Sequence, residues 1–273
     1  MNRPLSGFLF VRRLLLLGIL MGVILPLLPL LVWAFSHRWL FPDIVPESLS
    51  LRSWTYIVHP GSRILWAIAN SLIIALAVTF LAMVVGVPAG RALGLYRFKG
   101  KMVAELILLS PALIPSMTVT MGIQILFIRF GITESLLGVI LVHLIPTIPY
   151  MTISMSGVFS HYDISFEEQA RSLGAGNIQI FTHITLPAIF PGIVVGCLFS
   201  FLISWGQYIL TLMIGGGRII TLPLLLFSFA SSGDNALTAS LGLLFLLPSV
   251  LILIFTSRFL TGKSSGFGSF GGL

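Results

Sequence analysis

The sequence predicts an all-α membrane protein with about six transmembrane helices, and three observations carry that prediction. Of its 273 residues, 57% are hydrophobic and only 8% are charged, whereas a soluble domain carries roughly 25% charged residues. Apolar runs recur along the chain with the ~20-residue length that a helix needs to cross ~30 Å of hydrocarbon. The alternating segments of an outer-membrane barrel are missing from the sequence. Helices are expected because a helix satisfies its own backbone polar groups in lipid.

The predicted spans follow one another along the chain. They cover residues 14–35, 64–88, 102–128, 135–157, 188–213 and 236–257. The first run follows Arg12 and Arg13, as the apolar part of a secretory signal would. At about 22 residues, however, it exceeds the 7–15 apolar residues of such a signal. We therefore expect it to remain in the protein as the first transmembrane helix.

Basic residues predict the orientation in the membrane. With the N-terminus inside, ten of the fifteen Lys and Arg residues fall on the inner side, most densely from Arg91 to Lys101. Short loops with such an excess stay in the cytoplasm. We expect a cytoplasmic N-terminus over residues 1–13, a six-helix transmembrane domain over 14–260 and a flexible cytoplasmic tail over 261–273. The net charge of +7 then favours anionic lipid as the partner, and not nucleic acid.

A polar block over residues 159–187 separates the fourth and fifth predicted spans on the inner side. Its early acidic residues, Glu167 and Glu168 among them, suit the positive N-terminal end of a helix. The stretch from Gly174 to Asn177 predicts a break, because Gly and Asn accept the left-handed backbone that ends helices. A second, amphipathic helix is expected to follow and to end at Pro187, where the fifth span begins. The block therefore predicts a helix-turn-helix on the cytoplasmic face.

The residues of this block resemble the EAA loop of permease subunits of ABC importers that work with an external solute-binding protein. That pattern is Glu-Ala-Ala, then a glycine, then Ile-x-Leu-Pro. Gln169 replaces the first alanine here. The matching positions are Glu168, Ala170, Gly174, Ile184, Leu186 and Pro187, with Arg171 as in the usual surroundings of the motif. The likeness extends over about residues 64–260, with Asn70-Ser71-Leu72 and Thr221-Leu222-Pro223 as further similar stretches.

The resemblance implies the type I importer permease fold, a location in the bacterial cytoplasmic (inner) membrane and one half of a solute pathway. It implies four partners: two ATP-binding subunits, a second permease subunit that is a different homologous chain, and an extracytoplasmic solute-binding protein. It also implies that the seven loop residues, Glu168 to Pro187, couple the pathway to ATP hydrolysis. We expect Glu168 to be a polar anchor, either at the interface with the ATP-binding subunit or within the loop. The stretch Ser204–Tyr208 is most similar to spermidine/putrescine-type permeases, which implies a polyamine or another small solute.

The chain itself shows no means of binding ATP. It lacks the Gly-x-x-x-x-Gly-Lys-Ser/Thr loop that cradles phosphates, and Gly215-Gly216-Gly217 is expected to be a turn on the outer side. We therefore expect no cofactor in this chain, with ATP and Mg²⁺ bound by the partner, and a transport subunit instead of an enzyme.

Polar residues within the predicted spans are the candidates for the solute path, because such groups are costly in lipid and face a cavity or another helix. Hydrogen bonding between helices is the plainer interpretation of each one, and His143 is expected to serve as such a helix-to-helix donor. The candidates are Asn70, Tyr150, Ser204, Gln207, Tyr208 and Thr211.

Two other classes of membrane protein stay open as alternatives. An ion-coupled secondary transporter would need a coupling-ion site and often shows internal repeats; the sequence shows no repeat and no acidic residue in the centre of a span. An intramembrane enzyme would need a catalytic cluster, and the five histidines are scattered without metal-ligand spacing. No metal site is therefore expected.

Overall fold

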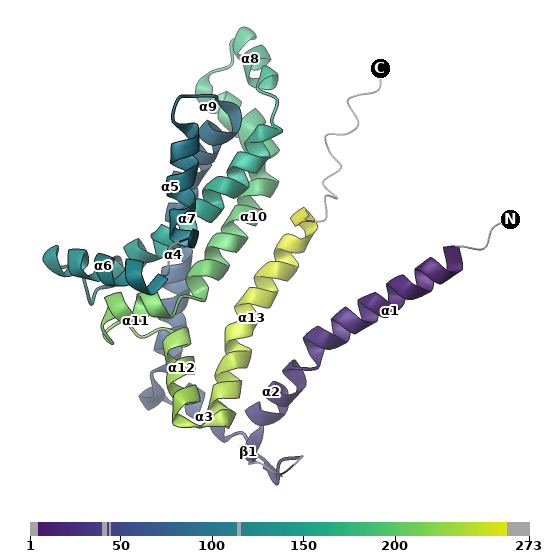
Figure 1. The fold of residues 1–273 in the computed structure, drawn as a ribbon, viewed down its shortest axis with the longest axis vertical. Coiled ribbons are helices and arrows are strands. Elements are labelled where there is room, and N and C mark those ends of the chain that lie inside the picture. Colours follow the sequence, from purple (N-terminus) through teal and green to yellow (C-terminus); the bar gives the residue numbers. More distant parts are fainter. Residues whose placement is uncertain (1–4, 40–42, 44, 114–115, 261–273) are drawn as a thin grey trace. The chain divides into compact units, whose positions relative to one another are not determined.

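The structure is a computed structural model that describes residues 5–39, 43, 45–113 and 116–260. It divides into two compact units. The first comprises Met1–Leu65 with Leu225–Leu247, and the second comprises Trp66–Leu224 with Pro248–Leu273. Apart from one pair of short strands, the described elements are helical (Figure 1), as the composition predicted.

The first unit begins with helices α1 (Leu5–Ile24) and α2 (Leu27–Ala34). Pro26 lies between them with φ of −66°, and its missing amide hydrogen interrupts the hydrogen-bond ladder of the helix. Together, Val11–Ala34 are long and apolar enough to cross a membrane, and the most apolar part of this stretch has no buried residue. Lipid or another chain must therefore cover it.

The rest of the first unit joins the beginning of the chain to a distant segment. Its further elements are β1 (Ser36–Arg38), β2 (Ser48–Leu49), α3 (Arg52–Val58), the 3₁₀ turn η1 (Pro60–Ser62), most of α12 (Leu222–Ser232) and the first half of α13 (Asn235–Leu260). The two strands pair antiparallel. Ser240 Oγ donates a hydrogen bond of 3.2 Å to the carbonyl of Ala34, 206 positions earlier, and Tyr56 packs edge-on against Phe229.

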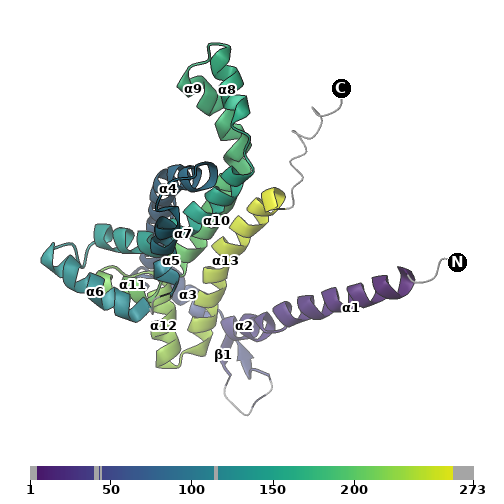
Figure 2. The same ribbon diagram turned by 45° about the horizontal axis from the view of Figure 1, so that its top comes forward.

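The second unit contains the long helices of the middle of the chain. They are α4 (Ile64–Leu95), α5 (Lys101–Leu113), α6 (Ser116–Arg129), α7 (Leu136–Ser160), α8 (Ser165–Ser172), α9 (Asn177–Ile180), the π-helical turn η2 (Phe181–Thr185), α10 (Leu186–Trp205) and α11 (Ile209–Gly215). Both views show α7 and α10 side by side, with α8 and α9 at one end of the pair (Figure 1; Figure 2).

Helix α7 is the centre of this unit. One buried cluster joins it to α4, α6 and α11 and includes Val78, Val142 and Ile214. A second cluster joins it to α4 and α10 and includes Met151 and Phe159. Because both clusters lie along α7, the neighbouring helices of this unit pack against it.

Glycines bring α4 and α10 unusually close to α7. A Cβ added at Gly86, Gly90 or Gly94 of α4 would lie 2.5, 2.5 and 2.6 Å from side-chain atoms of α7. A Cβ at Gly196 of α10 would lie 2.5 Å from the sulfur of Met151. Small residues at such contacts let helix backbones approach closely, which is how helices associate without a hydrophobic driving force in lipid.

Five helical stretches of the described chain are long and apolar enough to cross a membrane, against the six that we expected. They are Val11–Ala34, Ile64–Leu95, Leu136–Ser160, Asn177–Trp205 and Asn235–Ser257. The predicted third span, 102–128, is the exception, because α5 ends at Leu113 and α6 begins at Ser116. The two helices run in different directions (Figure 1; Figure 2). Pro111 lies inside α5, where it removes one bond of the helical hydrogen-bond ladder. The run also contains Pro115, which lies outside the described residues.

The predicted fifth span, 188–213, is also wrong at both ends. The helix runs from Asn177 through α9, η2 and α10 to Trp205, and α11 is separate. Pro187 therefore does not end the second helix of the polar block. It is the second residue of α10, directly after the π-helical turn η2, and lies inside the continuous helix Asn177–Trp205.

The remaining predicted boundaries fall partly outside the described residues. These are the start of the N-terminal segment 1–13 and the whole tail 261–273. The first, second, fourth and sixth predicted spans each correspond to one apolar helical stretch.

Candidate functional site

The polar block forms the short helix α8, a tight turn and then α9, which is the beginning of the long helix Asn177–Trp205. The helix, the turn and the following helix were predicted from the sequence, and the end of the second helix at Pro187 was wrong. Gly174 has φ of +87°, a left-handed conformation that glycine adopts without steric cost. The amide of Ala175 donates to the carbonyl of Ala170 at 3.0 Å, and the amide of Gly174 donates to the carbonyl of Arg171 at 3.0 Å. This pair of bonds is a Schellman motif, which satisfies the last carbonyls of α8. The turn from Leu173 to Gly176 is therefore a defined structure.

The outer face of α8 and α9 is both apolar and charged. Leu173 is 89% exposed and Ile178 is 80% exposed, and Glu168 and Arg171 are exposed beside them. Large apolar side chains that stand free at the tip of a turn are typical of an interaction surface. We name this set, with Phe166, which is 51% exposed, the loop surface.

The inner face of α8 is held by Glu167, which the sequence analysis did not single out as an anchor. Glu167 is 4% exposed, and its carboxylate accepts four hydrogen bonds. Arg91 donates to Oε1 at 3.0 Å and to Oε2 at 2.7 Å. Tyr162 Oη and Thr185 Oγ1 both donate to Oε1, at 3.0 and 2.8 Å. Glu168 points outward, so within the chain the anchor of the loop is Glu167.

The charges of this cluster are balanced. The guanidinium of Arg91 lies 5.7 Å from the ring centroid of Phe159, a cation–π distance, and Phe159 packs edge-on against Tyr162. Burial raises the pKa of the Glu167 carboxyl, but hydrogen bonds from Arg91, Thr185 and Tyr162 lower it by more. Its pKa therefore lies below the ordinary glutamate value, and Glu167 is ionised at neutral pH.

Sequence reasoning missed these partners because each looked ordinary alone. Arg91 counted as a loop charge, since the second span was expected to end at residue 88, whereas α4 continues to Leu95. Tyr162 and Thr185 lie in a block where polar residues are common. One signal was available: Arg91 follows an apolar run and precedes the apolar Ala92 and Leu93, which marks a charge that needs a partner.

The other predicted loop residues divide between turn and packing. Ala170, at the end of α8, is half-buried and its carbonyl is part of the Schellman motif. Ile184 and Leu186 are half-buried and Pro187 is exposed. In α9 and η2, the most deeply buried residues are Ile180 and Thr185, which are 3% and 1% exposed.

Two of the predicted path residues are hydrogen-bonded to His143. His143, 1% exposed, lies 3.0 Å from Ser204 Oγ through Nδ1 and 2.9 Å from Thr211 Oγ1 through Nε2. Ser204 and Thr211 are themselves 3% and 0% exposed. The histidine thus joins α7 to the end of α10 and to α11, and both hydroxyls have a packing role in this chain.

The other path candidates are placed differently. Asn70 Nδ2 donates to the carbonyl of Ile220 at 3.0 Å, and the carbonyl of Gln207 accepts from Thr211 Oγ1 at 3.1 Å. Tyr208 is half-buried at the start of α11. Tyr150 on α7 is the most exposed of the set, at 48%. A role of these residues in the solute path stays a prediction.

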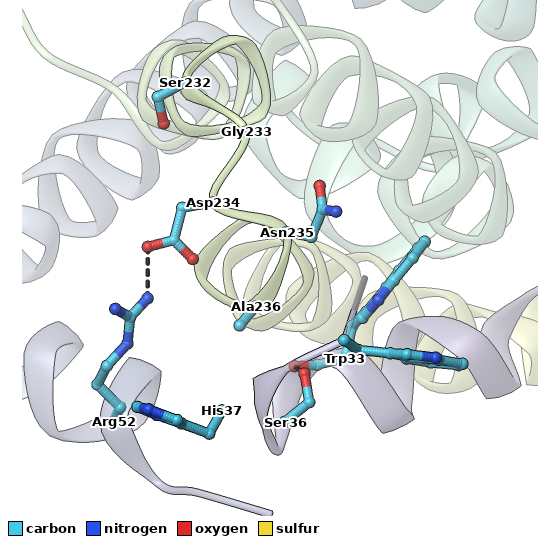
Figure 3. A pocket seen from close by; sticks show the side chains of 10 residues that line it. Trp33, Ser36, His37, Arg52, Ser232, Gly233, Asp234, Asn235 and Ala236 are labelled. Carbon is cyan, nitrogen blue, oxygen red and sulfur yellow. Dashed lines mark hydrogen bonds and ion pairs between the residues drawn. The ribbon is translucent and has the colours of Figure 1, made fainter. Parts of the chain in front are cut away.

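The first unit holds a separate polar cavity of about 380 Å³. Arg52 and Asp234 form an ion pair of 2.6 Å across it, with side chains 52% and 32% exposed. Figure 3 shows Arg52 and His37 on one side, Asp234 and Asn235 on the other, and Trp33 beside Ser36. The cavity is open, and the side chains of its ion pair are more exposed than those of the Arg91–Glu167 pair.

A family model described as "Binding-protein-dependent transport system inner membrane component" matches residues 84–262. This range includes the whole helix-turn-helix and Glu167. The chain belongs to this family. It is a permease subunit of an ATP-binding-cassette importer, and the ion-coupled secondary transporter is set aside.

Curated relatives carry several names. The chain is 28% identical over 213 residues to the spermidine/putrescine permease PotC of Haemophilus influenzae, covering 78% of this chain and 82% of the relative. It is 29% identical to the maltodextrin permease MdxG of Bacillus subtilis, over 72% of this chain and 73% of the relative. It is 27% identical to the putative 2-aminoethylphosphonate permease PhnV of Salmonella typhi, over 86% and 88%.

Solved structures share the fold. A chain of a bacterial ABC transporter that imports the acidic polysaccharide alginate superposes with a TM-score of 0.71 at 17% identity, covering 94% of this chain and 98% of that one. A chain of the MetNI methionine ABC transporter superposes with a TM-score of 0.54 at 19% identity, over 72% and 96%. The all-α membrane permease fold is therefore shown.

Proposed function

We propose that the loop surface docks one ATP-binding subunit and passes its movement to the helices of the second unit. The observation that carries this proposal is the exposure of Leu173 and Ile178, at 89% and 80%, on a turn that is itself well bonded. Apolar side chains on a rigid, protruding element fit a groove of a partner. Glu168 and Arg171, exposed on the same surface, would add polar contacts at its rim.

The proposed assembly contains four further subunits: a second, different permease chain, two ATP-binding subunits and an external solute-binding protein. The basic connection from Arg91 to Lys101 supports a cytoplasmic location of the loop, and with it cytoplasmic N- and C-termini. ATP hydrolysis then belongs to the partner, and this chain supplies half of the pathway.

Gly174→Asp tests the coupling role. Aspartate at φ of +87° strains the turn and places a carboxylate at the tip, so solute uptake is expected to fall at least tenfold. The chain should stay in the membrane at normal abundance, and co-purification of the ATPase should weaken.

Gly217→Asp is the matched control, because Gly217 also has positive φ, +77°, and a Cβ there would likewise meet no atom within 4 Å. It lies far along the chain, in the turn after α11. Wild-type uptake by Gly174→Asp, or equal losses in both variants, would contradict the proposal.

For the solute, we propose a small polar organic compound of the polyamine type, on the likeness to PotC. Uptake of labelled spermidine, a maltodextrin and 2-aminoethylphosphonate by cells with and without this chain tests it. Spermidine uptake that depends on the chain supports the proposal, and dependence of one of the other two solutes replaces it.

A further inference from the structure

The Glu167 carboxylate connects three segments that are far apart in the sequence. Arg91 belongs to α4, Tyr162 to the connection after α7, and Thr185 to η2, which leads into α10. Glu167 itself is in the first turn of α8. One buried side chain thus joins the coupling helix to three neighbours.

Arg91 and Thr185, two of the residues that donate to this carboxylate, also line a groove of about 400 Å³. The rest of its wall includes Val87 and Pro88 of α4 and Leu186 and Ile189 of α10. The described side-chain hydrogen bonds between α4 and α8 are those of the ion pair.

The ion pair is held more firmly than a surface contact. The Glu167 side chain is 5% exposed, and both terminal nitrogens of Arg91 donate to it, a bidentate geometry that fixes direction as well as distance. Separating the two would leave a buried carboxylate without its countercharge, which costs far more than the loss of an exposed pair. A displacement of α8 should therefore carry α4 with it.

We propose that Arg91 and Glu167 form the joint through which the coupling helix α8 moves the transmembrane helix α4. This inference rests on the proposed docking of the ATP-binding subunit to the loop surface. Arg91 is a positioning residue in this scheme: it contacts neither the ATPase nor the solute, and acts by holding Glu167. The two neighbouring acids have different roles: Glu168 faces the ATP-binding subunit, and Glu167 faces the helices of the second unit.

The test measures whether α8 and α4 move together. Spin labels are placed at Val85→Cys on α4 and Ser172→Cys on α8 in a Cys197→Ser background. Distances are measured in lipid nanodiscs for the complex purified with its ATPase, without nucleotide and with a non-hydrolysable ATP analogue. In the otherwise unchanged chain, the distance should stay the same in both states.

Arg91→Gln should free α8 from α4. The distance distribution should become at least twice as broad and should shift when the analogue binds. Arg97→Gln is the matched control, because Arg97 is exposed in the connection that follows α4, and it should behave as the unchanged chain. Arg91→Lys keeps the charge but loses the bidentate geometry, so an intermediate breadth is expected, and it serves if Arg91→Gln fails to assemble.

Two outcomes would overturn the joint. One is a nucleotide-dependent shift of the same size in the unchanged chain; the other is a narrow, unshifted distribution in Arg91→Gln. Failure of the proposed function is distinguishable, because the ATPase would then not co-purify with any variant. The breadth of the distribution in the isolated chain would still report whether Arg91 holds α8.

Discussion

Two ion pairs of almost equal length lie in different units of this permease and differ in burial and in the number of hydrogen bonds. Arg52–Asp234 is 2.6 Å long and Arg91–Glu167 is 2.7 Å long. The first has side chains 52% and 32% exposed, and its carboxylate accepts two hydrogen bonds, one from Arg52 and one from the backbone amide of Leu237. The second has side chains 29% and 5% exposed, and its carboxylate accepts four hydrogen bonds. Length alone therefore says little about what an ion pair does.

Burial and the number of partners decide the difference. Water screens an exposed pair, and holding two long side chains in one geometry costs entropy, so such pairs contribute about 0–1 kcal/mol. A buried carboxylate that loses a partner is left unsatisfied, which costs the desolvation free energy of the charged group. The pair in the second unit should therefore behave as a structural joint, and the pair in the first unit as a weak, adjustable contact.

The largest expected effect is that of Arg91→Ala, which leaves the Glu167 carboxylate buried without its cation. Removing one partner of a buried pair destabilises by about 3–5 kcal/mol, so thermal unfolding of the detergent-solubilised chain should begin at clearly lower temperature. Arg97→Ala, in the exposed connection, is the control and should unfold like the unchanged chain. A loss of unfolding free energy below about 1 kcal/mol would mean that the Arg91–Glu167 pair contributes no more than an exposed ion pair.

Acid should separate the pairs next. The pKa of Glu167 in the folded chain lies below its ordinary value, about 4.3. Its contribution is therefore complete above that ordinary value and is lost as the pH falls through the lower folded pKa. Stability of the unchanged chain should therefore fall as the pH is lowered below about 4.3, and Glu167→Gln should flatten part of that fall. Asp163, fully exposed with a pKa lowered by the backbone amide of Ser165, titrates in both proteins and cancels. Parallel curves would show that Glu167 is not the responsible group.

The smallest effect is expected in the first unit. Asp234→Asn removes the charge that meets Arg52 but keeps a side chain of similar size, so unfolding should shift by no more than about 1 kcal/mol. About 1 M salt should abolish even this difference, because it shortens the screening length to ~3 Å. A loss as large as that of Arg91→Ala would mean that the cavity around Asp234 is closed in the assembled protein.

Much of the architecture was predictable from the sequence. Apolar length and the cost of bare backbone in lipid identified helices and most spans, because these depend on composition alone. The predicted span boundaries were wrong where single residues decide the backbone conformation. The third run contains Pro111 and Pro115, and Gly206 follows the end of α10 before α11 begins. A run of apolar letters does not distinguish one long helix from two short ones.

Of the candidate site, the sequence by itself determined the turn and its place in the chain. Gly174 was recognisable because only a few residue types accept a left-handed backbone, a property of the single residue. Tertiary structure alone decided which acid faces inward. Glu167 and Glu168 are adjacent and chemically equal, but successive residues of a helix point about 100° apart. Only the positions of α4 and η2 bring Arg91 and Thr185 to one of them, since a buried charge is stable where distant segments supply its partners.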